Sequence, residues 1–240
     1  MKVDIESVVT VSTAVSKNVE IIKPKHTVNH LYLTCFSLLL AMASAIQVGY
    51  ILSCNGQVGF VLAQKLGWEQ SSFFNNVVLS ATLSPMGIAI GSLIGGIVAD
   101  KISLRNLILV ANAFGILFNF VNIQETTPTI LLGRFFAGVA GGLMNFSFGK
   151  ALNETVPQEH SSAYGMLVNA GICAGIFFAG VMGLIIPLED INDPTSYEKM
   201  KNDQNWKIVW GVPILMGALS LILIPIFIKS LSLKNVIQTS

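Results

Sequence analysis

Gly-Gly-Ile-Val-Ala-Asp-Lys-Ile-Ser-Leu-Arg, residues 95–105, is the stretch that decides the fold. The apolar segment before it carries glycines at four-residue intervals, and a second apolar segment begins directly after it. Both segments are long enough to cross a membrane as helices. A charged turn this short between two membrane-length helices is compatible with few folds, so the turn constrains the arrangement of the whole chain.

The composition predicts a membrane protein. Apolar residues make up 52% of the chain and charged residues only 11%, whereas about a quarter of the residues of soluble domains are charged. The charges gather between long apolar runs, and a membrane span needs about 20 such residues. Lipid offers the backbone no hydrogen bonds, so each run must be a helix. We therefore predict an all-α membrane protein, in contact with membrane lipid, with six transmembrane helices at residues 31–52, 77–99, 104–123, 129–152, 162–188 and 208–228.

Both ends of the chain are predicted to lie on the inner side of the membrane. Residues 1–30 form a polar N-terminal tail without the early apolar region of a secretory signal peptide. Residues 31–230 form the membrane domain, and residues 231–240 form a C-terminal tail. Lysine and arginine are more frequent in the tails and in every second loop than in the other loops, which indicates the inner side. The sequence does not identify the membrane, which could be the plasma membrane or an organellar membrane such as the mitochondrial inner membrane.

Small residues recur every four positions in two of the predicted helices. In the second helix they are Gly87, Gly91 and Gly95, and in the fifth they are Gly171, Gly175, Ala179 and Gly183. Membrane helices associate through close backbone packing, because lipid provides no hydrophobic drive. We predict that both stripes are helix–helix contact faces; room for a substrate or for helix sliding is the alternative.

Several motifs, in order along the chain, resemble the sugar-porter branch of the major facilitator superfamily. Its G-G-x-x-A-D-R-x-G-R-R turn is matched at Gly95, Gly96, Ala99, Asp100, Lys101 and Arg105. Its fourth-helix motif is matched at Arg134, Gly138 and Glu154. Gln47 opens a match to Q-x-G-Y in the first helix, and Asn205 opens a match to N-W-R in the sixth. The resemblance implies the N-terminal half of that fold, two inverted three-helix repeats.

The resemblance also implies a solute site and a partly lost latch. Asn169 stands where the family has a sugar-contacting Gln, so we expect it to be the deepest side chain of any polar cavity, with Gln47 beside it. Ser103, Leu104 and Ser161 replace a Gly and two Arg of the family's inner face. In the family that face latches the N-terminal six helices to six more. Six spans with these replacements favour a half-fold that no longer rocks against another half.

Charged residues at the predicted membrane boundaries have a structural interpretation. Arg134 and Lys150 lie about 24 Å apart along one helix, so both are expected to be interfacial anchors; for Arg134 a buried partner or pathway charge is the alternative. Asp100 and Glu154 are expected to pair with Lys101, Arg105 or Lys150. No acidic residue lies clearly in mid-membrane, so proton coupling lacks its usual carrier.

Nothing in the sequence indicates catalysis. His26, His30 and His160 lack metal-ligand spacing, and no nucleophile stands with a base. We therefore expect no enzyme activity, no catalytic residues, no metal and no cofactor. The formal net charge of +1 implies no nucleic-acid partner.

Three functions remain open. The first is an accessory or structural subunit of a larger membrane complex, which the tail 1–30 and the charged loop 188–206 would contact through other membrane-protein subunits. The second is a transporter of a sugar-like solute that works as a homodimer of halves, with Asn169 and Gln47 as substrate contacts. The third is a truncated product without function.

Overall fold

The structure is all-helical. The computed structural model describes residue 38 and residues 44–68, 70–156, 161–187 and 195–230, and these contain helices and turns without a strand. In chain order the helices are α3 (Ile46–Lys65), α4 (Gln70–Ala99), α5 (Leu104–Asn122), α6 (Thr127–Thr155), α7 (Ser161–Gly183), the short α8 (Ser196–Asn202) and α9 (Asn205–Ser230). Six of these helices are long and apolar enough to cross a membrane, which confirms the six predicted spans.

The boundary predicted for the first span is wrong at its C-terminal end. We expected this helix to end at residue 52, but α3 continues to Lys65. The polar residues after position 52 interrupted the apolar run in the sequence. In the structure Asn55 is only 2% exposed, and its Nδ2 donates a hydrogen bond to Ser80 Oγ on α4 at 3.2 Å. A neighbouring helix therefore accepts a hydrogen bond from the amide nitrogen of a side chain that looked unsuited to a span.

The predicted loop 188–206 contains a helix. Residues 196–202 form α8, and Met200 on α8 is 1% exposed in the same apolar cluster as Val58 and Trp206. Lys65 Nζ also donates to the Asp203 carbonyl at 3.1 Å. The described part of this loop therefore packs on its own chain. Residues 1–30, 188–194 and 231–240 lie outside the described residues, so their contact with other proteins stays a prediction.

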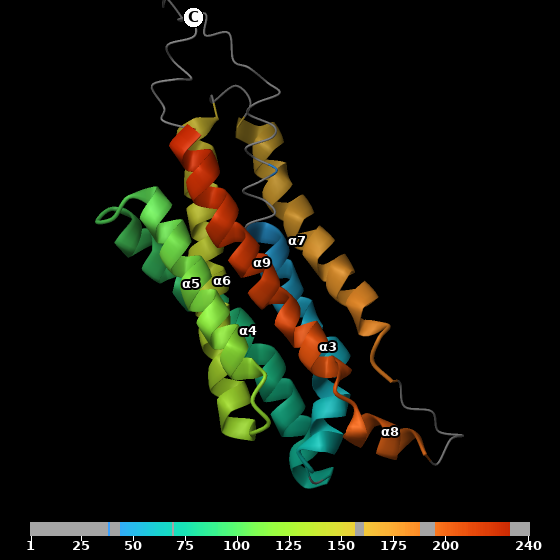
Figure 1. The fold of residues 1–240 in the computed structure, drawn as a ribbon. Helices are drawn as coiled ribbons and strands as arrows, with labels where there is room; N and C mark the ends of the chain where they lie inside the picture. Colours follow the sequence, from blue (N-terminus) through green and yellow to red (C-terminus); the bar gives the residue numbers. More distant parts are fainter. Residues whose placement is uncertain (1–37, 39–43, 69, 157–160, 188–194, 231–240) are drawn as a thin grey trace, which may run out of the picture. The chain divides into compact units, whose positions relative to one another are not determined.

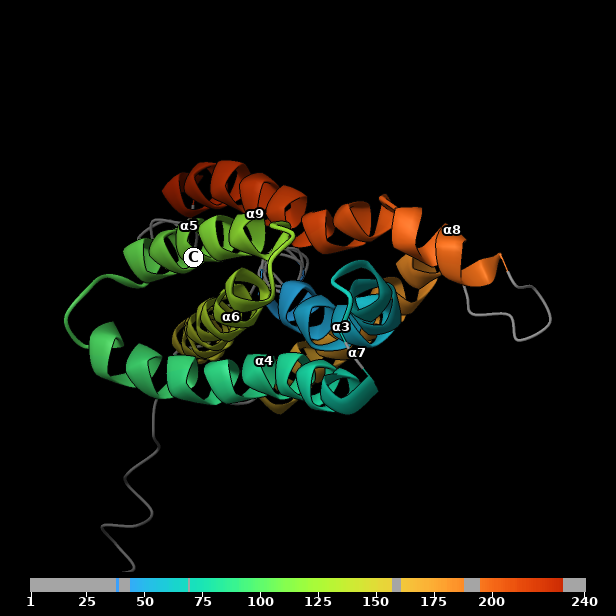
Figure 2. The ribbon, with the colours of Figure 1, turned by 90° about the horizontal axis from the view of Figure 1, so that it is seen from below.

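The helices form three layers (Figures 1 and 2). Viewed along the bundle, α3 and α6 lie in the middle, α5 and α9 cover one side, and α4 and α7 flank the other side. The most extensive helix pair is α4 with α6, followed by α5 with α6 and then α3 with α7. Within the described residues, α4 and α7 do not touch each other. They leave part of α3 and α6 uncovered between them.

The pairing of helices has the symmetry of two inverted repeats. The first repeat consists of α3, α4 and α5, and the second of α6, α7 and α9, in the same order. When each helix is replaced by its counterpart in the other repeat, the α3–α7 pair becomes the α6–α4 pair. The α5–α9 pair maps onto itself. Because each repeat contains three spans, the second repeat starts from the opposite membrane surface. This agrees with the predicted fold class.

Glycine allows the α4–α6 pair and the α3–α7 pair to approach closely. A Cβ at Gly91 would overlap the carbonyl of Val139, and a Cβ at Gly142 would overlap the carbonyl of Ile88, so α4 and α6 touch backbone to backbone. Along α3 and α7, Gly49 and Gly175 meet backbone carbonyls of the other helix in the same way. The prediction that the glycine stripes are contact faces is confirmed.

The α4–α6 contact can be tested with a matched pair of glycine variants. Gly91→Ala places a methyl group on the Val139 carbonyl, and we expect it to destabilise the folded protein by about 1–3 kcal/mol. A Cβ at Gly180 of α7 meets no atom within 4 Å. Gly180→Ala should therefore be neutral or stabilising, because Ala favours helix more than Gly does. The measurement is thermal unfolding of both variants in detergent. Equal unfolding temperatures for the two variants would contradict the close contact.

Candidate functional site

That Asn169 is the deepest side chain of a polar cavity stays a prediction. In the structure Asn169 lies on α7 and is exposed. The reason is the narrow contact of α7, which buries mainly Gly171, Gly175, Ala179 and Gly183. Asn169 lies on another face of α7, close to the middle of that helix. No described element covers it.

Gln47 is turned toward α5 and α9. It is 1% exposed, and its Nε2 donates to Asn112 Oδ1 on α5 at 3.3 Å and to Ser220 Oγ on α9 at 3.1 Å. Asn112 in turn donates to the carbonyl of Ile108 at 2.9 Å. These bonds join three helices inside the bundle. The structure therefore gives Gln47 a helix-joining position and does not bring it to the exposed face that holds Asn169.

Arg134 is a buried cation, which corrects the expectation of an interfacial anchor. It is 1% exposed, its Nη2 donates to the Ile51 carbonyl at 3.1 Å, and its Nη1 lies 3.4 Å from Cys54 Sγ. Its guanidinium carbon lies 5.4 Å from the centre of the Trp210 ring. The backbone of α3 and the Trp210 side chain of α9 cover the guanidinium before it can reach the interface. All of these partners are neutral, and its Nε has no hydrogen-bond acceptor among the described residues.

Lys150 joins the family motifs at one end of the bundle, which we call the Asp100 end. Its Nζ donates to the Ala99 carbonyl at 2.9 Å and lies 3.8 Å from Asp100 and 3.9 Å from Glu154. The expected pairing of both acids with a nearby base is confirmed for Lys150. Lys101 and Arg105 are exposed at the same end. The motif glycines pack between helices, Gly96 beside the Phe146 ring and Gly138 against the Ser84 backbone.

Glu125 ties together the other end of the bundle, which we call the Glu125 end. Its carboxylate lies 2.7 Å from Lys207 Nζ and 3.6 Å from Lys65 Nζ. Both ammonium groups also lie within 6 Å of the Trp206 ring centre, at 5.7 and 5.9 Å. The hydrogen bond from Lys207 is the main cause that holds the pKa of Glu125 below its ordinary value. This cluster connects α3, the α5–α6 turn and α9.

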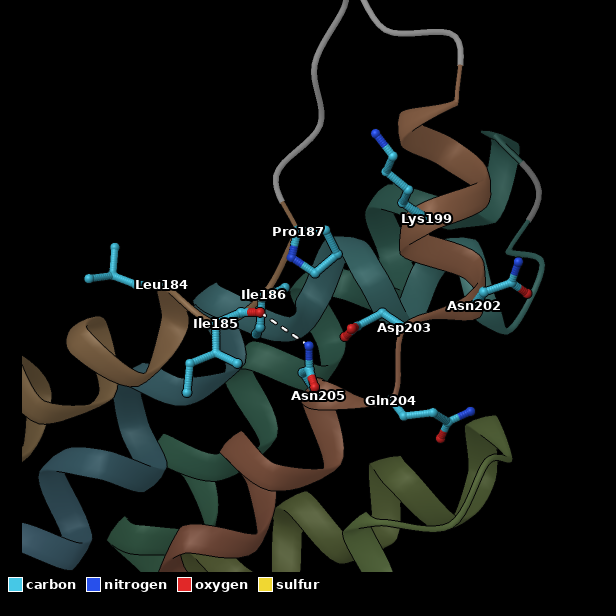
Figure 3. A pocket seen from close by; sticks show the side chains of 9 residues that line it. All are labelled: Leu184, Ile185, Ile186, Pro187, Lys199, Asn202, Asp203, Gln204 and Asn205. Carbon is cyan, nitrogen blue, oxygen red and sulfur yellow. Dashed lines mark hydrogen bonds between the residues drawn. The ribbon is translucent and has the colours of Figure 1, made fainter.

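A pocket of about 640 Å³ opens beside the end of α7 (Figure 3). Side chains from the α7 terminus and from α8 and the start of α9 line it, and Asn205 Nδ2 donates to the Ile185 carbonyl at 3.3 Å across it. Leu184, which is 82% exposed, stands at its edge. The pocket is shallow and we assign it no ligand. Among the described residues, no group of His, Cys, Asp or Glu could hold a metal ion.

The structure reveals polar residues that sequence reasoning missed. Asn112 and Ser220 complete the Gln47 network, and Tyr50 OH donates to the Val209 carbonyl at 2.7 Å to join α3 with α9. A usable signal was present, because amides inside apolar spans need partners. The sequence could not say which helix would provide each partner.

Comparison with known proteins identifies relatives over most of the chain. The family model described as "Sugar (and other) transporter" matches residues 36–230. Solute carrier family 2, facilitated glucose transporter member 5 of Ovis aries is 24% identical over 208 residues, covering 81% of this chain and 39% of that protein. The probable plastidic glucose transporter 1 of Arabidopsis thaliana is 31% identical over 140 residues, covering 58% of this chain and 26% of that protein. This chain thus spans about two fifths of the length of the first of these relatives.

A solved structure shares the fold. It is the major facilitator superfamily proton:xylose symporter XylE bound to 6-bromo-6-deoxy-D-glucose, which superimposes with a TM-score of 0.68 at 15% identity. The match covers 82% of this chain and 45% of that chain. At this identity the likeness concerns the fold, and it agrees with the six helices described above.

The cluster at the Glu125 end should stabilise the fold in a pH-dependent way. The folded-state pKa of Glu125 is lowered, so its contribution is complete above the unfolded pKa of about 4.3 and is lost as the pH falls through the folded pKa. Glu125→Gln should lower stability by about 0.5 kcal/mol at pH 7, a small effect because the pair is solvent-exposed. The difference from the unmodified protein should shrink as the pH falls below the unfolded pKa and the carboxylate becomes protonated.

Thermal unfolding between pH 3 and pH 7 measures this effect. Glu198→Gln, which changes an exposed glutamate on α8, serves as the control and should show no comparable pH-dependent difference. An effect of Glu125→Gln that is as large at pH 3 as at pH 7 would rule out the ionised carboxylate as the source.

Proposed function

Because the chain belongs to the sugar transporter family of the major facilitator superfamily, we propose that its six helices form one wall of a transmembrane pathway for a neutral, sugar-like solute. The proposal goes beyond the family, since the matched relatives are much longer than this chain. Alternating access requires two bundles that move about a shared site. A second six-helix bundle, from whichever chain supplies it, would face the side of this bundle between α4 and α7.

The position of Asn169 carries the proposal. It is an amide near the middle of an apolar helix, exposed on the side where α3 and α6 are uncovered. A polar side chain facing hydrocarbon is costly, and such residues usually face a water-filled path or another protein surface. A solvated pathway between two bundles meets this requirement. The two relatives and the solved structure named above all carry glucose or xylose in their names, which supports a sugar-like solute.

The charges inside the bundle favour facilitated movement over proton-coupled transport. Arg134, buried near the Glu125 end, has neutral partners. Among the described residues, no Asp or Glu lies within a span except Glu154 near the end of α6, where Lys150 pairs with it. A proton symporter needs a group that binds and releases a proton along the pathway. We propose that this chain lacks one.

An accessory role in a larger membrane complex remains the second candidate. It is supported by Lys150, which engages both Asp100 and Glu154 within the same bundle. Because both carboxylates already pair with Lys150, they are less able to form ion pairs with a second bundle that moves against this one. The arrangement would suit a bundle that stays fixed against its neighbours. Transport is preferred here because α8, part of the loop expected to contact other subunits, packs on its own chain.

Replacement of Asn169 tests the transport function. In liposomes that contain the purified protein, we expect Asn169→Ala to raise the KM for D-glucose or D-xylose uptake about two- to tenfold, the effect of losing one hydrogen bond. Thr82→Ala is the control. Thr82 is exposed on α4 and lies two residues from both Ser80 and Ser84, which face neighbouring helices, so it points away from the pathway. Absence of sugar uptake by the unmodified protein would contradict the transport function and favour the accessory role.

A pH gradient separates facilitated from proton-coupled uptake. We expect the initial rate of uptake into the same liposomes to be unchanged when the proton concentration outside is made about 100-fold higher than inside, a difference of about 2 pH units. The control is the same gradient collapsed by a protonophore. A rate that rises with the gradient and falls with the protonophore would establish proton coupling and contradict this part of the proposal.

A further inference from the structure

We propose that Asn145 of α6 is a second solute-contacting residue, which faces the same opening as Asn169 of α7, and that the two amides together take a neutral polyhydroxy solute. The inference rests on the proposed transport function and adds to it the second residue and the chemical class of the ligand. Sequence comparison with the family did not single out Asn145. The observation that draws attention to it is a buried oxygen without a donor.

Contacts along α3 place the two amides at similar depth. On one side of α3, Gly141 of α6 lies against the Val48 side chain, and on the other side Gly49 lies against the backbone of Ile172 of α7. Asn145 follows Gly141 by one helical turn, about 6 Å, and Asn169 precedes Ile172 by about 4.5 Å. Because α6 runs antiparallel to α3 and α7 runs parallel to it, both steps lead toward the Asp100 end. The depths therefore agree to within about 3 Å.

The direction of Asn145 follows from its neighbours on α6. Gly138 and Gly142 face backbone atoms of α4, and Gly141 faces Val48 of α3 together with Ile88 of α4. With 3.6 residues per turn, position 145 falls between positions 138 and 141 around the helix. Asn145 therefore points toward the junction of α3 and α4. Figure 2 shows this junction on the side of α6 away from α5.

The direction of Asn169 follows from Phe178 on the same helix. Phe178 packs against the Tyr50 ring at 5.7 Å, and Tyr50 donates its hydroxyl hydrogen bond to α9. Nine residues separate Phe178 from Asn169, which is two and a half helical turns, so the two side chains leave α7 on opposite sides. Asn169 consequently points away from α9 and toward the side that holds α4. Both amides therefore face the opening between α4 and α7.

The chemistry of the two amides selects a neutral ligand. Asn145 is half-buried, and its Oδ1 is withdrawn from solvent without a hydrogen-bond donor among the described residues. An acceptor buried without a donor costs free energy, which a ligand hydroxyl would recover. Each amide also offers two N–H donors, so vicinal hydroxyl groups can both donate and accept. The two cations of α6 are engaged by other groups, Arg134 by the Ile51 carbonyl and the Trp210 ring and Lys150 by Asp100 and Glu154, so an ionic solute would find no free counter-charge on α6.

Binding in lipid nanodiscs tests the site without requiring transport. Nanodiscs avoid detergents with sugar headgroups, and saturation-transfer NMR detects weak binding of D-glucose and myo-inositol. We expect Asn145→Ala to weaken the binding of both by about two- to tenfold. Asn75→Ala removes an exposed amide from α4, two residues from Val77, whose side chain faces Gly59 of α3. This matched control should bind as the unmodified protein does. The anionic sugar acid D-gluconate should bind less well than D-glucose.

The outcomes separate the site from the function. Equal binding by Asn145→Ala and the unmodified protein would overturn the site, and it is also the result expected if an ordered water serves as the partner of Oδ1. Absence of polyol binding by the unmodified protein would overturn it as well. Binding that depends on Asn145 without uptake into liposomes would support the site and reject transport. If Asn145→Ala does not fold, Asn145→Thr retains an oxygen acceptor at nearly the same volume but removes the amide N–H donors, and it should bind less tightly than the unmodified protein.

Discussion

Close backbone contact between helices is the constraint on which the rest of this structure depends. Membrane helices gain little from apolar burial against one another, because lipid is equally apolar. Here α4 meets α6 and α3 meets α7 along stripes of glycine that bring carbonyl groups within contact distance. These two pairs are equivalent under exchange of the repeats. They fix the middle layer, and they hold α4 and α7 far enough apart to leave one side of α3 and α6 uncovered.

Two groups of amide and hydroxyl side chains in the spans face opposite sides of the bundle. Gln47, Asn112 and Ser220 bond to one another between α3, α5 and α9, where the layer is closed. Asn145 and Asn169 lie toward the side between α4 and α7. The first group is satisfied by neighbouring helices and so contributes to helix packing. The second group has free bonding capacity at Asn145, which is the property expected of a surface that meets a solute.

The two ends of the bundle are held by different interactions. At the Glu125 end, one carboxylate joins two lysines over the Trp206 ring and ties α3 to α9 through exposed charges. At the Asp100 end, Lys150 reaches the last carbonyl of α4 and the two motif acids. A cation at the C-terminus of a helix also interacts favourably with the helix dipole. Both arrangements stabilise contacts within this bundle. A second bundle that bound Asp100 or Glu154 would have to compete with Lys150 for these carboxylates.

The amino-acid sequence by itself determined the helical class, the six spans, the glycine contact faces and the family, because each depends on local composition or on short-range spacing. Hydropathy identifies a span wherever about 20 residues avoid water, and a four-residue repeat identifies one face of a helix. Only the tertiary structure decided where α3 ends, that Arg134 is buried, that Gln47 faces α5 and α9, and that Asn169 is exposed. Each of these depends on which helix lies opposite a given face. The partners of Asn55, Arg134 and Gln47 are Ser80, Ile51 and Asn112, which lie 25 or more residues away in the chain. Local spacing in the sequence therefore could not predict these pairs.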